Sequence, residues 1–394
     1  MIEQPSDPRP SDDVAKLGDI AAAAGIRRVT MLAWRDLEDP EAGGSEVHAA
    51  RVAELWSRAG IDVTMRTSFA AGHPPVVRRD GYRVIRKAGR YMIFPRAPFS
   101  EVMGWHGAAD GLVEIWNGMP FFSPVWSRRP RVVWLHHVHD TMWEMTLPPR
   151  LARLGRTVEF RVAPPLYRRA SVVTLSESSR AEIESRLRLR DVTVVPPGVD
   201  PRFSPGDGRE AETPLVVAVG RLVPVKRFHV LVNALARLRP RFPGLRLVIV
   251  GEGYERPALE AEVARVDGAE WIELPGRVGG DELVALYRRA WLVASASAHE
   301  GWGMTLTEAA ACGTPAVASR ISGHADAVID GETGLLVDGA DGFAPALERV
   351  LGDAALRRRL GEAARNRAAA LTWGATARGT LEVLAAEVAR HRAR

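Results

Sequence analysis

Residues 291–315 read WLVASASAHEGWGMTLTEAAACGTP, which is a strand pattern, a glycine-rich turn and a helix pattern in succession. Trp291–Ala294 is a short apolar run of strand length. The two glycines that follow open a helix, which we predict to begin at Met304 or Thr305, and Gly313 ends it. A strand that leads through a glycine turn into a helix is one unit of a parallel α/β sheet.

The same alternation extends from this stretch in both directions and covers the chain. Helical patterns separate the apolar runs almost everywhere. The predicted strands are Val29–Ala33, Val63–Thr67, Tyr82–Ile85, Leu112–Ile115, Val132–His136, Val172–Leu175, Val192–Val195, Leu215–Val219, Leu247–Val250, Trp271–Leu274, Trp291–Ala294, Ala316–Ala318 and Leu335–Val337. We therefore predict an α/β fold with parallel sheets covered by helices on both faces.

The strand–helix pattern is interrupted most clearly at Val195-Pro-Pro-Gly-Val-Asp200, and a polar stretch follows at 204–214. Proline and glycine at this density cannot continue a helix or a central strand. A length of 394 residues also suits two domains. We predict two Rossmann-like domains, 1–200 and 201–372, facing each other across a cleft. A last helix at 373–394 is expected to cross back to the N-terminal domain.

Two cations follow the strand Leu215–Val219. Gly220 marks a sharp turn, and Arg221 and Lys226 stand in the loop after it. Arginine offers phosphate a planar fork of donors and lysine a compact charge, so the pair suits an anion. The alternative is two ordinary surface cations.

Two acids and a helix start follow the strand Trp291–Ala294. Glu300 lies in the loop, and Glu308 lies one turn inside the helix. The free backbone N–H groups at Gly303–Thr305 would attract an anion at the edge where Arg221 and Lys226 stand. Carboxylates accept paired sugar hydroxyls. The alternative is an early helix charge and a loop acid.

Composition narrows the class of protein. The chain has one cysteine, no apolar run long enough to span a membrane, and no basic, apolar start of the kind that directs secretion. We predict a cytoplasmic protein without a disulfide. The net charge is +5, but the basic residues are not interleaved with a base-stacking motif, so nucleic acid is not expected as a partner.

In these residues the chain resembles glycosyltransferase family 4, whose members are retaining enzymes of the GT-B fold. The resemblance covers most of the sequence. It runs through Gly43-Gly44-Ser45-Glu46 and Val195–Asp200 in the first half, and through Gly220-Arg221, Lys226, Gly276-Arg277-Val278 and the Glu300-x7-Glu308 signature in the second.

The resemblance implies a role for each matching residue. Arg221 and Lys226 would bind the diphosphate of a nucleotide-sugar donor, Glu308 the ribose, and Glu300 the donor sugar. Val278 would lie against the base, and Gly44 would approach the phosphates from the first domain. Backbone contacts to sugar and phosphate are implied for Gly301, Trp302, Gly303, Met304 and Thr305, with Trp302 in place of the usual phenylalanine.

The strand Val132–His136 ends in a histidine, and His137 and His139 follow it. The family has one histidine at this place, near the donor sugar. Successive strand residues point to opposite faces, so only some can reach the cleft. We favour His137 and then His136 over His139. A zinc site and packed structural histidines are the alternatives.

The predicted reaction needs no metal, because prearranged cations and N–H groups can stabilise charge on the leaving diphosphate. No cofactor is expected beyond the nucleotide-sugar co-substrate, whose base and sugar the sequence leaves open. Retention is implied by the resemblance, and front-side attack is our working hypothesis. The alternatives are a non-catalytic GT-B scaffold and an epimerase or phosphorylase acting on a nucleotide sugar.

We expect the first domain to bind the acceptor, which is not identified. Its aromatic residues, among them Trp105, Trp116 and Phe121, could stack on a sugar or contact a lipid, and the alternative is that they pack in the core. Residues 148–161 combine Leu151 and Leu154 with several arginines. A helix of this pattern lies well on an anionic membrane surface, so peripheral membrane contact is a further expectation.

Overall fold

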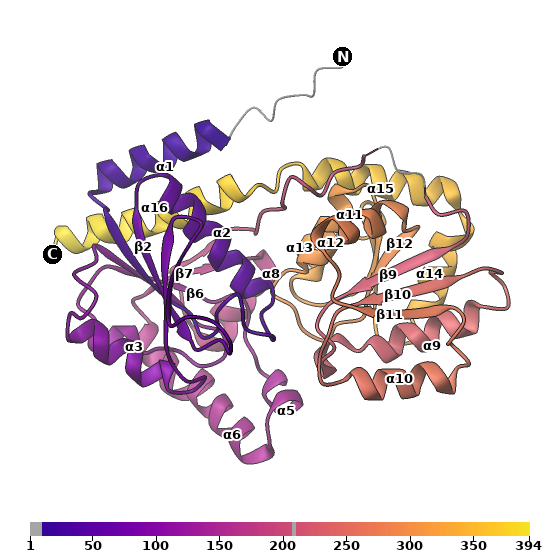
Figure 1. The fold of residues 1–394 in the computed structure, drawn as a ribbon, viewed down its shortest axis with the longest axis horizontal. Helices are drawn as coiled ribbons and strands as arrows, with labels where there is room; N and C mark the ends of the chain where they lie inside the picture. The colour runs from indigo at the N-terminus through magenta and orange to yellow at the C-terminus, as the bar shows by residue number, and fades with distance from the viewer. Residues whose placement is uncertain (1–9, 207–209) are drawn as a thin grey trace.

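The computed structural model describes residues 10–206 and 210–394, which form two α/β domains side by side (Figure 1). The predicted fold class is confirmed. Residues 1–9, and residues 207–209 within the polar stretch at 204–214, lie outside the described residues. From Pro10 the chain is already helical, in α1 (Pro10–Ala24), because Leu17 and Ala21 find a buried partner surface.

The N-terminal domain is built on an eight-stranded sheet of order β3-β4-β2-β1-β5-β6-β7-β8. All neighbouring strands are parallel except β3, which pairs antiparallel with β4 at the edge. The strands are β1 (Arg28–Leu32), β2 (Asp62–Ser68), β3 (Val76–Arg79), β4 (Tyr82–Ala88), β5 (Gly111–Ile115), β6 (Arg131–Trp134), β7 (Ser171–Thr174) and β8 (Val192–Val194).

Helices and two π-helical turns join these strands. They are α2 (Gly44–Arg58), α3 (Ile93–Val102), α4 (Ser123–Trp126), α5 (Met142–Thr146), α6 (Pro149–Thr157), η1 (Val158–Val162), α7 (Ala163–Tyr167), α8 (Glu177–Glu182) and η2 (Ile183–Leu187). Central strands such as β5 and β6 are buried on both faces, as a parallel sheet covered by helices requires.

The C-terminal domain has a fully parallel sheet of order β11-β10-β9-β12-β13-β14. Its strands are β9 (Leu215–Val219), β10 (Arg246–Val250), β11 (Ile272–Gly276), β12 (Leu292–Ser295), β13 (Ala316–Ser319) and β14 (Gly334–Val337). Its helices are η3 (Pro224–Lys226), α9 (Phe228–Leu238), α10 (Arg256–Arg265), α11 (Gly280–Arg289), α12 (Met304–Ala311), α13 (His324–Ala327), α14 (Phe343–Gly352) and α15 (Ala354–Ala368).

The chain passes between the domains twice, and the two passages lie together. The Val199 N–H donates to the Leu371 carbonyl at 3.0 Å, and the Thr376 hydroxyl donates to the Pro196 carbonyl at 2.8 Å. After the second passage α16 (Trp373–Arg392) lies along α1 on the N-terminal domain (Figure 1). Its Leu381 and Leu384 are fully buried in that domain's core.

Side chains also join the domains beside the cleft. The Asp326 carboxylate accepts hydrogen bonds from the backbone of Glu177 and Ser178 at the start of α8. On the other side, Arg277 donates to the carbonyl of Pro40. Among the described residues, no helix is both long and apolar enough to cross a bilayer.

Candidate active site

The site is built where β9 and β12 end, because these strands are neighbours and their loops leave the same edge of the sheet. The two loops are tied together by a backbone hydrogen bond and by a hydrogen bond from the Arg227 side chain. The Ala298 N–H donates to the Val225 carbonyl at 2.7 Å, and Arg227 Nε donates to the Ala296 carbonyl at 2.7 Å. Arg227 was not among the predicted site residues, since nothing in its neighbourhood marks it as a loop anchor.

Lys226 and Glu300 form an ion pair across these loops. The Ser297 hydroxyl also donates to Glu300, at 2.9 Å. Burial alone would raise the pKa of Glu300, but the Lys226 ammonium and the nearby His324 lower the pKa to about 2. Glu300 is therefore an acceptor, and not a proton donor, at neutral pH.

Arg221 lies where the two domains meet, and it faces the start of α2. A Cβ atom built on Gly43 would lie 3.5 Å from Arg221 Nε, and one on Gly44 would lie 3.1 Å from Met304 Sδ. The N-termini of α2 and α12 thus meet across the cleft beside Arg221. The first N–H groups of each helix have no partner within the helix, and both helix dipoles favour an anion here.

The turn before α12 depends on glycine at two positions. Gly303 has φ 104°, a left-handed conformation that side chains rarely adopt. A Cβ on Gly301 would lie 2.7 Å from the His136 carbonyl oxygen, so this loop packs directly against the N-terminal domain. The Trp302 side chain is buried in the core of the C-terminal domain.

Glu308 lies in the first turns of α12 and accepts a hydrogen bond from the Tyr287 hydroxyl at 3.2 Å. Burial raises its pKa to about 7, and the Asp200 carboxylate adds to the rise. Val278, in the loop before α11, is partly buried against the same core as Trp302. Gly220 lies beneath the Lys226 stem, since a Cβ there would be 3.2 Å from Lys226 Cε.

The three histidines after β6 differ in direction. His137 is partly exposed, and its pKa is lowered to about 4 by burial, with Glu300, His299, Lys226 and Arg221 as its charged neighbours. His136 is buried, and its ring meets that of His48 with centroids 5.0 Å apart. The structure therefore brings His137 to the ion pair and turns His136 into the N-terminal core.

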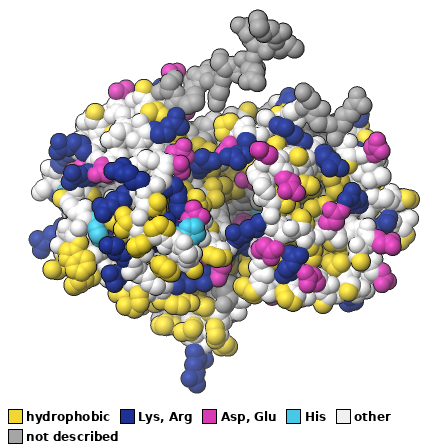
Figure 2. Space-filling model, in the orientation of Figure 1, with side chains coloured by type: hydrophobic (Ala, Val, Ile, Leu, Met, Phe, Trp, Pro, Cys, Tyr) yellow, Lys and Arg dark blue, Asp and Glu magenta, His cyan; other side chains and the backbone are white. Residues whose placement is uncertain are grey.

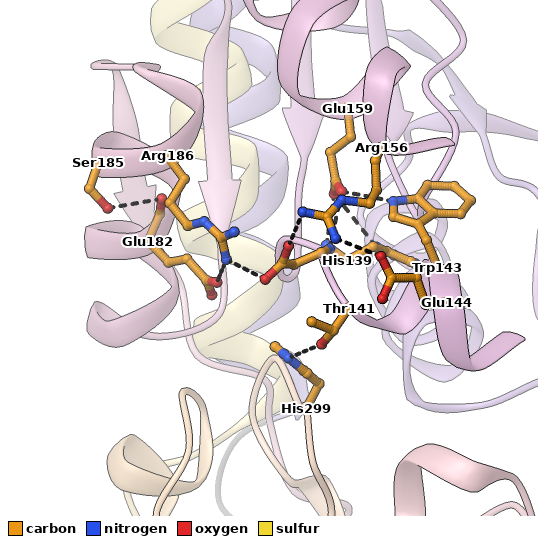
Figure 3. Close-up of polar contacts among 11 residues, drawn as sticks. His139, Thr141, Trp143, Glu144, Arg156, Glu159, Glu182, Ser185, Arg186 and His299 are labelled. Atoms are coloured by element: carbon orange, nitrogen blue, oxygen red, sulfur yellow. Dashed lines mark hydrogen bonds and ion pairs between the residues drawn. The ribbon is translucent and has the colours of Figure 1, made fainter. Parts of the chain in front are cut away.

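A buried acid that the sequence did not reveal holds the histidine loop. The Glu159 carboxylate, in η1, accepts hydrogen bonds from the His139 N–H at 2.7 Å, the Asp140 N–H at 3.2 Å and Trp143 Nε1 at 2.8 Å (Figure 3). Asp140 in turn pairs with Arg156 and Arg186. An acid within an apolar helix pattern is the only signal that points to Glu159.

One hydrogen bond of this loop crosses the cleft. Thr141 Oγ1 lies 3.1 Å from His299 Nε2, next in sequence to Glu300 (Figure 3). His139 stacks on His137 with ring centroids 4.7 Å apart. Among residues 10–206 and 210–394, no three His, Cys, Asp or Glu side chains are placed to hold a metal ion.

The arrangement is that of a GT-B enzyme, with the candidate site between the domains. The model of "Glycosyltransferase Family 4" matches residues 42–203, and that of "Glycosyl transferases group 1" matches residues 199–367. A D-inositol 3-phosphate glycosyltransferase of Nocardia farcinica is 40% identical, over 87% of this chain and 84% of its own length. The chain belongs to glycosyltransferase family 4, and it is a hexosyltransferase-type glycosyltransferase.

Solved structures agree on the fold. Sucrose-phosphate synthase of Thermosynechococcus elongatus is similar with a TM-score of 0.78 and 24% identity, over 90% of this chain and 97% of its own. HepE of Anabaena, solved in complex with UDP-glucose, has a TM-score of 0.70 and 20% identity, over 92% and 99% of the two chains.

Proposed function

We propose that this enzyme transfers a sugar from a nucleotide-sugar donor to a hydroxyl acceptor, with retention of configuration and without a metal ion. One observation carries the proposal. Arg221, the Lys226–Glu300 pair and the facing N-termini of α2 and α12 converge on one point of the cleft. Arg221, Lys226 and the two helix N-termini supply positive charge and N–H groups at that point, which suits a diphosphate that gains negative charge as the sugar leaves.

The remaining site residues would each bind a different part of the donor. Glu308, deeper along α12, would accept the ribose hydroxyls, while Glu300 and His137 would meet the transferred sugar. His137 is neutral, and its buried Nε2 atom has no hydrogen-bond partner among the described residues. A hydroxyl of the bound sugar could form a hydrogen bond with this atom. No side chain is assigned as a nucleophile, which favours front-side attack assisted by the departing phosphate.

Donor and acceptor identities are the finer part of the proposal. We propose a UDP-sugar as the first donor to test, because HepE binds UDP-glucose on the same fold. The name of the Nocardia relative makes D-inositol 3-phosphate the first acceptor to test. Analysis of single-turnover products separates transfer from phosphorolysis or epimerisation, since only transfer yields a new glycoside together with the free nucleoside diphosphate.

A thermal-shift screen against UDP-, GDP-, ADP- and dTDP-sugars, with and without EDTA, tests donor binding directly. A donor at 100 times its Kd adds about 2.7 kcal/mol to the free energy of unfolding. The stabilising nucleotide identifies the donor class. If no nucleotide sugar raises the melting temperature, or if EDTA removes the shift, the proposed metal-free donor site is wrong.

Lys226→Ala tests the chemical step. Removing one prearranged charge-stabilising group lowers kcat by about 100- to 1,000-fold, and here it also leaves Glu300 without its partner. Lys87→Ala, which removes an exposed lysine of the N-terminal domain, is the matched control and should retain activity. Equal activity of the two variants, both folded by circular dichroism, would contradict the proposal.

A further inference from the structure

The exposed large hydrophobic side chains are strongly concentrated. Of the 15 found among the described residues, 14 lie between Phe69 and Leu166 in the N-terminal domain, and the other is Tyr254. Scattered apolar side chains are normal on a protein surface, but a concentration of this kind marks an interaction surface. Figure 2 shows hydrophobic side chains gathered along the lower edge of this domain, over α3 and α6.

These side chains belong to one continuous row of elements. α3 contacts α4, α4 contacts α7, α7 contacts η1, and η1 contacts α6. Each element contributes to the surface. The exposed residues of the row are Tyr91, Met92, Phe99, Val102, Met103, Trp105, Val125, Leu151, Leu154, Val162 and Leu166. We call this set the apolar row.

The charges along the apolar row have one sign. Seven exposed arginines lie on these elements and their ends, and none of them forms an ion pair within the described part of the chain: Arg96, Arg128, Arg150, Arg153, Arg161, Arg168 and Arg169. The acids nearby are neutralised or buried. Glu101 is buried between Arg66 and Arg129, Glu144 pairs with Arg156, and Glu159 binds the histidine loop.

A basic cavity of about 480 Å³ opens beside the row, between α4, α7 and the end of α16. Arg128, Arg131 and Arg169 line it together with Leu166 of the row, and the lining also includes Glu387, which pairs with Arg390. The cavity therefore presents several cations next to an apolar edge, which matches a phosphate attached to acyl chains.

We propose that the apolar row docks the enzyme peripherally on a bilayer that contains anionic phospholipids, with the basic cavity taking a lipid phosphate. Apolar side chains would enter the boundary between headgroups and acyl chains while the arginines contact the phosphates. The sequence suggested α6 for this contact. The structure extends the surface to α3 and its flanking residues, which contribute the exposed aromatic side chains Tyr91, Phe99 and Trp105.

The consequence for the reaction follows from where α6 leads. Its Arg156 pairs with Asp140, and η1, which continues it, carries Glu159 beneath the histidine loop (Figure 3). The docked surface and the loop that bears His137 are thus joined by direct contacts. Docking would hold the acceptor side of the cleft at the membrane surface.

Vesicle sedimentation with the full chain tests the proposal. Vesicles of phosphatidylglycerol and phosphatidylcholine should bind the protein at low salt, and vesicles of phosphatidylcholine alone should not. Arg150→Gln with Arg153→Gln should weaken binding by roughly 30-fold, because each basic residue near an anionic surface contributes about a fivefold factor. Arg349→Gln with Arg358→Gln, exposed arginines of the C-terminal domain, is the matched control.

The apolar part of the surface has its own variants. Phe99→Ala with Trp105→Ala removes two side chains that are exposed and in contact with each other, so the fold is kept. The pair should lose at least about tenfold in vesicle affinity, since each aromatic side chain buries a large apolar area, whereas Tyr254→Ala should lose nothing. Binding that ignores salt, or that falls equally in the control variants, would overturn the proposal.

Discussion

Glu308 shows how burial sets the chemistry of a single residue in this site. The Glu308 side chain is partly buried, and its carboxylate accepts a hydrogen bond from the Tyr287 hydroxyl. Burial raises its pKa to about 7, which brings its titration into the neutral pH range. A ligand that donates hydrogen bonds to this carboxylate favours its ionised form and therefore lowers its pKa.

We therefore predict opposite effects of pH on donor affinity and on stability. Donor Kd should rise about tenfold per pH unit below 7 as Glu308 takes up its proton. The pKa is higher in the folded state than in the unfolded chain, so the folded state holds a proton that the unfolded chain has lost between pH 4.5 and about 7. The free energy of unfolding then decreases as pH rises through this window.

Calorimetric titration of the donor and urea unfolding, both as functions of pH, check the two slopes. Glu308→Gln should flatten both of them. Glu282→Gln, an exposed acid of α11 in the same domain, should leave both unchanged. A pH-independent donor Kd in the parent enzyme would show that Glu308 does not contact the donor.

At the residue scale, the sequence identified the groups that follow strand ends. Lys226 and Glu300 could be found because β9 and β12 are clear apolar runs and their loops meet at one sheet edge. Arg227 and Glu159 could not be found, because both act through bonds to backbone that is distant in sequence or set by the loop's fold. The structure was also needed to tell which histidine faces the cleft. The His136 ring packs against His48 in the N-terminal core, whereas His137 lies near Glu300 and Lys226.

At the scale of elements, η1 shows what a short irregular segment contributes. It interrupts the helices α6 and α7 with a π-helical turn, and such turns often occur at functional sites. This turn aims Glu159 at two backbone N–H groups of the histidine loop. Glu159 is a positioning residue, because it acts on the site through His139 and Asp140.

We predict that Glu159→Gln lowers kcat and leaves the affinity for the free nucleoside diphosphate unchanged. An amide cannot accept all three hydrogen bonds, and a displacement of about 1 Å in the loop costs on the order of 100-fold in rate. The Kd of the free nucleoside diphosphate should stay constant, because Arg221, Lys226 and Glu308 lie in the other domain and His137 would meet only the transferred sugar. Glu144→Gln, an exposed acid that pairs with Arg156 in the same network, is the control and should have little effect on kcat.

Steady-state kinetics with calorimetric binding of the nucleoside diphosphate distinguish positioning from simple instability. A variant that loses affinity for the nucleoside diphosphate together with kcat would contradict the assigned role. A kcat equal to that of the parent enzyme would do so as well.

The elements that the sequence predicted well are the buried strands. Their apolar runs are unambiguous, and all 13 were found within a few residues of the expected ends. The elements it missed have competing signals. α3 contains Pro95 and Pro98, which argue against a helix, and β3 is a short polar edge strand. Tertiary packing on the sheet overrides these local preferences.

At the scale of the whole molecule, the last helix joins the two domains into one unit. α16 leaves the C-terminal domain beside the first passage and lies on α1, α2, β6 and β7 of the N-terminal domain. Leu384 is fully buried there, and a Cβ on Gly111 of β5 would come within 3.0 Å of it. The N-terminal core is therefore completed by residues that follow the whole of the C-terminal domain in sequence.

We predict that Leu384→Ala destabilises the N-terminal domain by about 2–5 kcal/mol, the range for a buried leucine truncated to alanine. Hydrogen exchange followed by mass spectrometry should show faster exchange in β5, β6 and α1, with β9 and β12 unaffected. Leu347→Ala, which truncates an equally buried leucine of α14 in the C-terminal core, is the matched variant and should give the reverse pattern. Because donor contacts lie mainly in the C-terminal domain, a donor nucleotide should still protect β9 and β12 in Leu384→Ala. Faster exchange confined to the C-terminal strands in that variant would mean that α16 does not stabilise the N-terminal core in solution.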